Sequence, residues 1–394
     1  MSDLPEIDLT DAAVLRDPFA AHGRARELSP LVRLVVPGMT LWGVPRHAEA
    51  RAVLSDPARF ALGPGTFAFR PDLPDDLKPY LRSMQEVEGP EHTRLRRLVA
   101  PAFTPRRAAE FRPRIEAIVE ELLDDLCAHA ANGPADLIMH LTRPLPMAVI
   151  CELVGIPWPE RPRWREYGAA VAAGAGAAFV EAMPGIIEGA KAAVAARRAD
   201  PRDDIVSDLV RAQDEDGDRL GDVELVGLVW QLVLGGQTPT NLLANGVEAL
   251  LAHPEQLAAL RSDPGLAPRA VEELMRWCGP QLLAFPRFTT QDVELSGVRI
   301  PRGEPVVAVI AAANRDPRAF PDPETFDITR AAPAPHLGFA HGPHFCLGAA
   351  FARVQTEVAL TALLRRAPGL TLAGDAQRAP DGGTWRLAAL PVAL

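Results

Sequence analysis

The segment FAHGPHFCLG contains the group with the most specific chemistry in this chain, the thiol of Cys346. A cysteine binds a metal ion as the thiolate, which is stabilised where glycines let backbone N–H groups turn toward the sulfur and aromatic rings exclude water. Gly342 and Gly348 meet the first condition. Phe339 and Phe345 meet the second. Because a thiolate that donates charge to iron favours O–O cleavage, we predict an axial iron ligand in an oxygen-activating site.

The complete pattern F-x-x-G-x-H-x-C-x-G around Cys346 resembles the haem-binding loop of the cytochrome P450 family. The resemblance extends from about Leu41 to the C-terminus. It implies a mainly helical (α-rich α+β), triangular fold with small antiparallel sheets. It also implies haem b with a cysteine thiolate ligand and dioxygen as co-substrate. Phe339, His344 and Gly348 are then cofactor-binding residues together with Cys346.

His92 and Arg96 lie four residues apart in EGPEHTRLRR, so on a helix both side chains project from one face. Two cationic donors on one face hold carboxylates through charge-assisted hydrogen bonds. An isolated pair of this kind more often marks a solvated basic helix face. The resemblance implies that both residues bind haem propionate, and it implies the same role for Arg287 and His344.

Glu273 and Arg276 lie three residues apart in VEELMRW, and Arg330 follows in FDITR. Taken alone, such a pair is usually a minor surface ion pair. The resemblance implies instead a buried ion network of all three residues behind the haem loop. We therefore assign them to structure.

The sequence LGGQTPTN interrupts a helix predicted over residues 223–253. Its two glycines leave room for a flat ligand, and Pro239 cannot donate the hydrogen bond that the Gly235 carbonyl would accept. We expect a local opening that holds dioxygen and water, with the Thr238 hydroxyl placed to donate a hydrogen bond to reduced dioxygen. Without the resemblance, a simple kink in a core helix is the usual interpretation.

Gln237 departs from the family's pattern, in which an acid precedes Thr238. An amide orders water but cannot deliver a proton by ionising. Three outcomes are open: another group or the substrate delivers protons, turnover is poorly coupled, or the reaction inserts no oxygen. Gln237 and Thr238 are therefore the candidate catalytic residues.

The elements that must position these residues are mostly helices. Strand signals cover residues 31–44 and 287–310, the second with a turn at Ser296 and Gly297. Helical periodicity covers residues 107–130, 223–253, 254–261 and 267–277. This mixture favours an α-rich α+β fold.

The resemblance places a mainly apolar substrate pocket around segments that are far apart in the chain. Small residues in the stretch 167–189 make it a weak helix, which fits a mobile lid or a tightly packed helix pair equally well. The candidate pocket residues are Phe67, Trp230, Leu234, Leu282, Leu283, Phe285 and Trp385.

Composition bounds the remaining possibilities. The chain has 394 residues, 48% hydrophobic and 23% charged, without a recognisable linker, so we expect one domain over residues 1–394. A net charge of −10 argues against a nucleic-acid partner. We see no signal peptide, no apolar run of membrane-spanning length and no disulfide spacing among the four cysteines. These features predict a cytoplasmic monomer with no membrane partner.

The sequence therefore predicts a monooxygenase that hydroxylates or epoxidises a small, mainly apolar molecule, in line with the family's place in specialised metabolism. Because no flavin or iron–sulfur segment is recognisable, two electrons must come from a separate ferredoxin and an NAD(P)H-dependent ferredoxin reductase. The arginine-rich run 94–112 and the surface around Cys346 are the expected basic docking face.

Two alternatives remain open. Gln237 keeps oxidative C–C or C–O coupling of an aromatic, indole or cyclic peptide substrate, without oxygen insertion, as the second candidate. The third is a non-catalytic haem-binding or ligand-binding protein with the same fold.

Overall fold

The computed structural model describes residues 4–63, 73–82, 84–172, 177–215, 220–236, 238–331 and 334–394. Packing divides the chain into two compact units. Unit 1 comprises Met1–Leu62, Leu123–Thr142 and Asn241–Leu394, and unit 2 comprises Gly63–Leu122 and Arg143–Thr240. The expectation of one domain over the whole chain stays a prediction.

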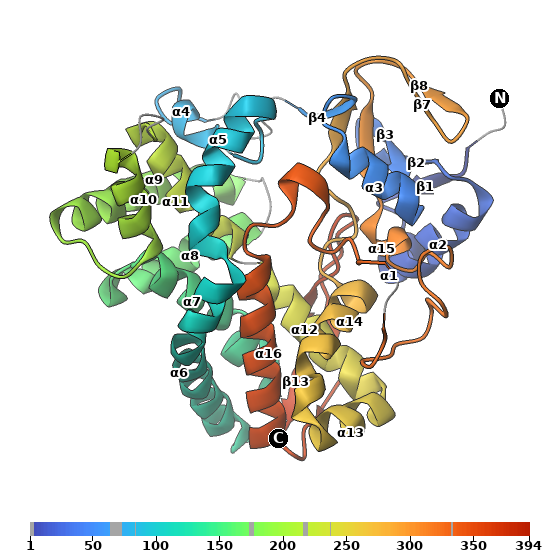
Figure 1. The fold of residues 1–394 in the computed structure, drawn as a ribbon. Helices are drawn as coiled ribbons and strands as arrows, with labels where there is room; N and C mark the ends of the chain where they lie inside the picture. Colours follow the sequence, from blue (N-terminus) through green and yellow to red (C-terminus); the bar gives the residue numbers. More distant parts are fainter. Residues whose placement is uncertain are drawn as a thin grey trace. The chain divides into compact units, whose positions relative to one another are not determined.

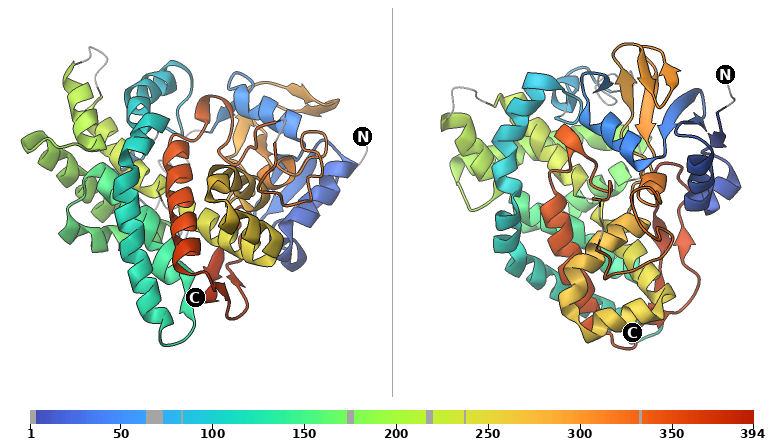
Figure 2. Two further views of the ribbon diagram at one scale, coloured as in Figure 1. Left: turned by 60° about the horizontal axis from the view of Figure 1, so that its bottom comes forward. Right: turned by 45° about the vertical axis from the view of Figure 1, so that its right-hand side comes forward.

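The largest sheet belongs to unit 1 and has the strand order β1-β2-β3-β9-β6-β4. Figure 2 shows its blue N-terminal strands next to orange strands from much later in the chain. The pairs β1–β2 and β3–β9 are parallel and the others antiparallel, because long connections separate the parallel partners. The strands are β1 (Glu6–Asp8), β2 (Val32–Val36), β3 (Met39–Val44), β4 (Phe60–Leu62), β6 (Arg287–Thr289) and β9 (Pro305–Ala308).

Smaller sheets complete unit 1. The hairpin of β7 (Val293–Leu295) and β8 (Val298–Ile300) turns at Ser296 and Gly297, which both have positive φ, as a two-residue type I′ turn requires. The predicted turn is confirmed. The other strands are β5 (Ala135–Asp136), β10 (Thr371–Leu372), β11 (Gln377–Arg378), β12 (Leu387–Ala389) and β13 (Pro391–Ala393), in the orders β10-β13-β5 and β11-β12.

Two helices of unit 1, α14 and α16, pack against each other. Both views of Figure 2 show the red α16 beside golden helices. The predicted segments 254–261 and 267–277 correspond to α13 and α14, so both predictions are confirmed. The helices are α1 (Ala12–Arg16), α2 (Pro18–Leu28), α3 (His47–Ser55), η2 (Ile138–Thr142, a π-helix), α13 (Pro254–Ser262), η4 (Pro264–Leu266), α14 (Ala267–Cys278), α15 (Ile310–Ala313), η5 (Gly342–His344) and α16 (Ala349–Arg366).

Unit 2 is helical throughout its described residues, apart from connections. In Figure 1, α9 lies among α8, α10 and α11, with which it packs. The helices are α4 (Lys78–Leu81), α5 (Gly89–Val99), η1 (Ala100–Phe103), α7 (Pro144–Val154), η3 (Trp158–Glu160), α8 (Arg161–Ala172), α9 (Ala177–Ala199), α10 (Ile205–Glu215) and α11 (Asp222–Gly235). Helices α6 (Pro105–Ala130) and α12 (Pro239–Ala252) contribute residues to both units.

Glycines let α9 approach α8 closely. A Cβ on Gly189 would lie 2.9 Å from Cζ2 of Trp164, and a Cβ on Gly185 would overlap the Tyr167 hydroxyl. Only a residue without a side chain fits at either position. In the described part of the stretch 167–189, the small residues therefore serve a tightly packed helix pair, which favours that interpretation over the mobile lid.

The predicted single helix over residues 223–253 is two helices. Helix α11 ends at Gly235 and α12 begins at Pro239, so the expected opening is a complete interruption. Pro239 lacks the N–H that a continuous helix needs, and two glycines precede the break. Among the described residues, no helix combines the length and apolarity needed to cross a membrane.

Candidate active site

The loop that carries Cys346 has a fixed backbone. The Cys346 N–H donates to the Phe339 carbonyl oxygen at 2.9 Å, and the Phe345 N–H donates to the Gly342 carbonyl oxygen at 3.0 Å. Gly342 has φ +75°, and a Cβ there would lie 2.7 Å from the Leu54 carbonyl oxygen. Any other residue would be strained and would collide with backbone. Steric constraints therefore explain why the predicted motif has glycine at this position.

The surroundings of Cys346 favour a thiolate. The thiols of Cys151 and Cys278 are buried, and burial raises the pKa of each to about 12, so both stay protonated at neutral pH. Cys346 is exposed and lies three residues before Ala349, where α16 begins. The positive end of a helix dipole stabilises an anion at this place. Cys127 is half-buried.

Aromatic side chains cover one side of the loop. Phe339 is buried, its ring centroid lies 6.3 Å from that of Phe345, and the Arg353 guanidinium carbon lies 4.5 Å above the Phe339 ring. Phe345 is partly exposed. The expected exclusion of water by Phe339 agrees with its burial, whereas the exposure of Phe345 does not favour the same role for its ring.

A carboxylate that sequence reasoning missed anchors the loop to the two neighbouring helices. Glu272 on α14 accepts two hydrogen bonds from Arg353 on α16, at 2.5 and 3.0 Å, and lies 3.1 Å from Nε2 of His336. Burial alone would raise the pKa of Glu272, but the hydrogen bonds and charges of His336 and Arg353 outweigh it and lower the pKa to about 2. No local sequence pattern predicts this cluster, because His336 and Arg353 are 64 and 81 positions from Glu272.

The structure brings Glu273, Arg276 and Arg330 together. Arg276 donates to both Glu273 carboxylate oxygens at 2.7 Å, and Arg330 Nε lies 3.3 Å from Oε1 of Glu273. The side chains of Glu273 and Arg276 are 3% and 1% exposed. This is a buried ion network rather than a surface pair.

The ion network also holds the chain that leads to Cys346. Arg276 donates to the backbone carbonyls of Asn314, Pro323 and Thr325 at 2.9 to 3.1 Å. The Asn314 side chain in turn accepts the Leu337 N–H at 2.7 Å, and Leu337 is buried in the core beside the large sheet. The loop is therefore tied to the network through Asn314.

The candidate propionate ligands lie on separate elements. In unit 1, Arg287 on β6 is 2% exposed and donates to the Phe60 carbonyl oxygen at 3.1 Å, and His344 in η5 is half-buried. In unit 2, His92 is buried and Arg96 is half-buried on α5. The predicted helix that presents His92 and Arg96 from one face is confirmed.

At the helix interruption in unit 2, Gly235 borders open space and Gly236 is closely packed. No atom of the described residues lies within 4 Å of a Cβ placed on Gly235, whereas a Cβ on Gly236 would lie 3.0 Å from Cβ of Ile150. Thr238 follows, half-buried. Thr240 Oγ1 is buried without a hydrogen-bond partner among the described residues, and sequence reasoning missed it. Such a hydroxyl requires a water or ligand partner.

The candidate pocket residues differ in their surroundings. Trp230 in unit 2 is buried and its Nε1–H donates to the Tyr80 carbonyl oxygen at 2.7 Å. In unit 1, Leu282 is buried and Phe285 is 66% exposed. Leu283 packs against the core that contains β2 and β3. Phe67, Gln237 and the side chain of Leu234 lie outside the described residues.

Trp385 is held by several other residues of unit 1. Its ring makes an edge contact with Phe19, at a centroid distance of 5.4 Å, and the Arg378 guanidinium carbon lies 3.6 Å from its centroid. Its backbone oxygen accepts the Asn245 amide at 2.8 Å. These contacts give Trp385 a structural role in addition to the predicted one.

The arginine-rich run 94–112 is largely neutralised by carboxylates of unit 2. Four of its arginines form ion pairs: Arg94 with Glu224, Arg106 with Glu110, Arg107 with Asp208 and Arg112 with Glu116. Because carboxylates compensate these four charges, the run is less basic than its sequence suggests. Glu224 and Asp208 are far from their partner arginines in the sequence, so these two ion pairs could not be predicted from it.

These residues fit a haem group. An exposed cysteine lies at a helix N-terminus, and no described atom lies within 4 Å of a Cβ placed on the neighbouring Gly348, which leaves room for a flat ligand. In the same unit, the buried Arg287 provides a donor suited to carboxylates. Soft thiolate and cationic donors are the set that iron porphyrin requires.

Comparisons with known proteins agree with this chemistry. The family model for cytochrome P450 matches residues 265–376. The chain is 41% identical over 393 residues to the cytochrome P450 monooxygenase PikC of Streptomyces venezuelae, covering 95% of this chain and 91% of that protein. It is 43% identical over 359 residues to the mycinamicin IV hydroxylase/epoxidase of Micromonospora griseorubida, covering 89% and 88%.

The fold gives the same result. The crystal structure of the LnmA cytochrome P450 hydroxylase from the leinamycin biosynthetic pathway of Streptomyces atroolivaceus is similar, with a TM-score of 0.83 and 39% identity over 95% of this chain and 96% of that one. The predicted α-rich fold is confirmed. Family and fold imply haem with a cysteine thiolate ligand, the use of dioxygen, and a redox partner. The chain belongs to the cytochrome P450 family, as a haem-thiolate monooxygenase.

Proposed function

We propose that this monooxygenase hydroxylates or epoxidises a small, mainly apolar molecule of secondary metabolism, with Cys346 as the iron ligand. The observation that carries the proposal is the rigid loop that presents an exposed thiol at the N-terminus of α16. The names of relatives support the reaction class, since they include a mycinamicin IV hydroxylase/epoxidase and a hydroxylase of the leinamycin pathway.

Each side chain has a defined task in this proposal. Bound haem supplies the activation of dioxygen. Cys346 holds the iron as a thiolate, and its hydrogen-bonded backbone keeps the sulfur in one orientation. His92, Arg96, Arg287 and His344 are the proposed donors to the propionates. The pocket residues Trp230, Leu234, Leu282, Leu283 and Phe285, with Phe67 and Trp385, orient an apolar substrate and exclude water.

The first prediction tests the reaction type. With ferredoxin, ferredoxin reductase and NAD(P)H, a substrate found by spectral titration should yield a product that contains one oxygen atom from labelled dioxygen. Mass spectrometry of the product measures the label. Consumption of dioxygen with an unlabelled, coupled product would show oxidative coupling, which Gln237 keeps as the second candidate. Normal haem content without electron or oxygen consumption, for any donor, would show a non-catalytic protein.

Thr238 is proposed to hold a proton and a water molecule at the helix interruption, where Gly235 leaves space. A hydroxyl both donates and accepts, so it can pass on a proton that the amide of Gln237 cannot supply by ionising. Thr240, with its buried hydroxyl, is a second group available to order water there.

The second prediction is that Thr238→Ala lowers the product formed per NAD(P)H consumed by roughly tenfold and raises peroxide release, because a general acid–base group typically contributes at least this much. Thr238→Ser should keep most of the coupling. Thr361→Ala is the control, since the Thr361 hydroxyl donates to the Glu357 and Val358 carbonyls of its own helix, at 2.8 and 3.1 Å. Unchanged coupling in Thr238→Ala would remove the residue from the mechanism.

For the electron donor we propose a separate ferredoxin served by an NAD(P)H-dependent ferredoxin reductase. Because the arginines of the run 94–112 are paired, we assign docking to the surface of unit 1 around the Cys346 loop. Arg51 lies there, 3.4 Å from Nε2 of His341, and forms no ion pair with a residue that the structure describes. A single half-buried charge steers an acidic partner modestly, and salt weakens that attraction.

A further inference from the structure

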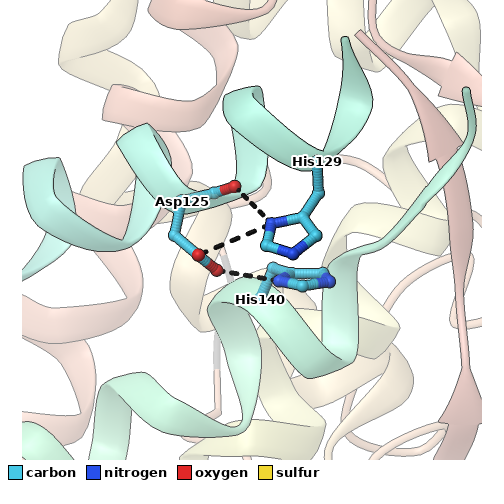
Figure 3. A group of neighbouring side chains, drawn as sticks. All are labelled: Asp125, His129 and His140. Atoms are coloured by element: carbon cyan, nitrogen blue, oxygen red, sulfur yellow. Dashed lines mark hydrogen bonds and ion pairs between the residues drawn. The ribbon is translucent and has the colours of Figure 1, made fainter. Parts of the chain in front are cut away.

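Three metal-ligating side chains of unit 1 meet outside the Cys346 loop. Asp125 and His129 lie near the C-terminal end of α6, and His140 lies in the π-helix η2. One ligand atom of each residue lies within 4.8 Å of the other two. Figure 3 shows both imidazole rings beside the carboxylate, with a nitrogen of each ring directed at Asp125. Neither the sequence motifs nor the proposed reaction uses these residues.

The nitrogens that face the carboxylate are the same in both rings. Nδ1 of His140 lies 2.8 Å from one Asp125 carboxylate oxygen, and Nδ1 of His129 lies 3.5 Å from the other. Nδ1 of His129 also lies 2.9 Å from the Asp125 backbone oxygen. The ring centroids are 3.9 Å apart and the ring planes are 30° from parallel. Both nitrogens and the carboxylate therefore surround one small region.

The backbone fixes this arrangement. Asp125 and His129 are four residues apart on α6, so their side chains share a face. The chain then reverses through β5, and Asp136 accepts the N–H groups of Ile138 at 3.0 Å and Leu390 at 2.9 Å. These bonds hold the start of η2, and π-helical turns are frequent at functional sites. Long-range backbone contacts, rather than loop mobility, bring His140 to α6.

Two imidazoles and one carboxylate are ligands for a divalent transition metal ion. In a tetrahedral zinc site, bonds of about 2.0–2.2 Å place ligand atoms about 3.3–3.6 Å apart. The observed separation of 3.5 Å falls within this range and that of 2.8 Å lies below it, so a small side-chain rotation of His140 suffices. A cation would replace the Nδ1 protons, and each neutral ring would carry its proton on Nε2 instead.

Exposure allows an ion to enter and leaves a position for water. The side chains of Asp125 and His129 are about half exposed, and His140 is 23% exposed. The carboxylate supplies the negative charge that two imidazoles lack. Hard cations such as Mg²⁺ prefer oxygen ligands, so the two ring nitrogens select zinc, nickel or copper.

We propose that Asp125, His129 and His140 bind one divalent transition metal ion of the Zn²⁺ type, which joins the C-terminal end of α6 to η2. The ion has a structural role, because it fixes two segments that are connected by only a short strand and turns. Binding to the folded state alone raises stability by mass action.

The experiment is a calorimetric titration of the chelator-treated holoprotein with Zn²⁺. We expect one site with a dissociation constant of about 1 mM or tighter. Each of His129→Gln, His140→Gln and Asp125→Asn should weaken binding by at least about tenfold, and Zn²⁺ should raise the thermal unfolding midpoint of the unchanged protein more than that of these three variants. The carbon monoxide spectrum of every variant checks that the haem region is intact.

His253→Gln is the matched control. His253 also places Nδ1 against the backbone oxygen four residues earlier, at 2.7 Å from Ala249, but it forms no ion pair with a described residue. This variant should bind Zn²⁺ as the unchanged protein does. Equal affinity in all variants, equal weakening in His253→Gln, or absence of binding by the unchanged protein would overturn the proposal.

Discussion

Cys346→Ser is expected to abolish the red-shifted Soret band of the reduced, carbon monoxide-bound protein and to lower monooxygenase activity by at least about a thousandfold, which corresponds to roughly 4 kcal/mol. A serine hydroxyl does not ionise at neutral pH, so it cannot donate charge to iron as a thiolate does. Serine keeps the backbone hydrogen bonds that hold the loop. Absorption spectra and product formation at equal haem content measure the effect.

Cys127→Ser is the control for this substitution. Cys127 is also a partly accessible cysteine but lies on α6, outside the loop. Its variant should keep both the band and the activity. A normal thiolate spectrum in Cys346→Ser, or its loss in Cys127→Ser with full haem content, would contradict the assignment of the iron ligand and with it the proposed reaction.

Arg276→Ala is expected to yield little or no haem-loaded protein. The substitution leaves the 3%-exposed carboxylate of Glu273 without its two closest donors and deprives three backbone carbonyls of their partner. Removing one member of a buried ion pair typically costs about 3–5 kcal/mol, a large share of the stability of a domain. Because Asn314 links this network to Leu337 at the start of the haem loop, the loop should lose its order as well.

The exposed pair of Arg299 and Asp292 provides the comparison for Arg276→Ala. Arg299 donates to Asp292 at 2.5 Å, but its side chain is 77% exposed. Solvent screens such a pair, so Arg299→Ala should give normal haem content. Haem-to-protein ratio after purification and the midpoint of urea unfolding measure both variants. Full haem incorporation in Arg276→Ala would show that the buried network is dispensable for the fold.

Several features depended on contacts that no local pattern records. Glu272 joins His336 and Arg353, and Glu224 neutralises Arg94 from 130 positions away. In both cases the partners come from segments that are distant in the sequence. Packing therefore reveals the pairing of Arg94 with Glu224, whereas Arg106 and Arg112 each pair with an acid four residues later on their own helix.

The interruption between α11 and α12 was predictable from the sequence in part only. Pro239 and the preceding glycines predicted an opening, because a missing N–H and weak propensity act through the residues themselves. How far the helix separates depends on neighbours, and the close approach of Ile150 to Gly236 is one of them.

The sequence by itself predicted the loop that carries Cys346, the helices that carry His92, Glu273 and Arg276, and the turn at Gly297, since each rests on steric or hydrogen-bonding rules that act within a few residues. Only the tertiary structure decided the contact of Glu272 with Arg353, the ion pair of Arg94 with Glu224 and the contact of His140 with α6. The physical reason is that these contacts join segments that are distant in the sequence. Which of them meet depends on the packing of the whole unit, and interactions within a few residues do not select the distant partner.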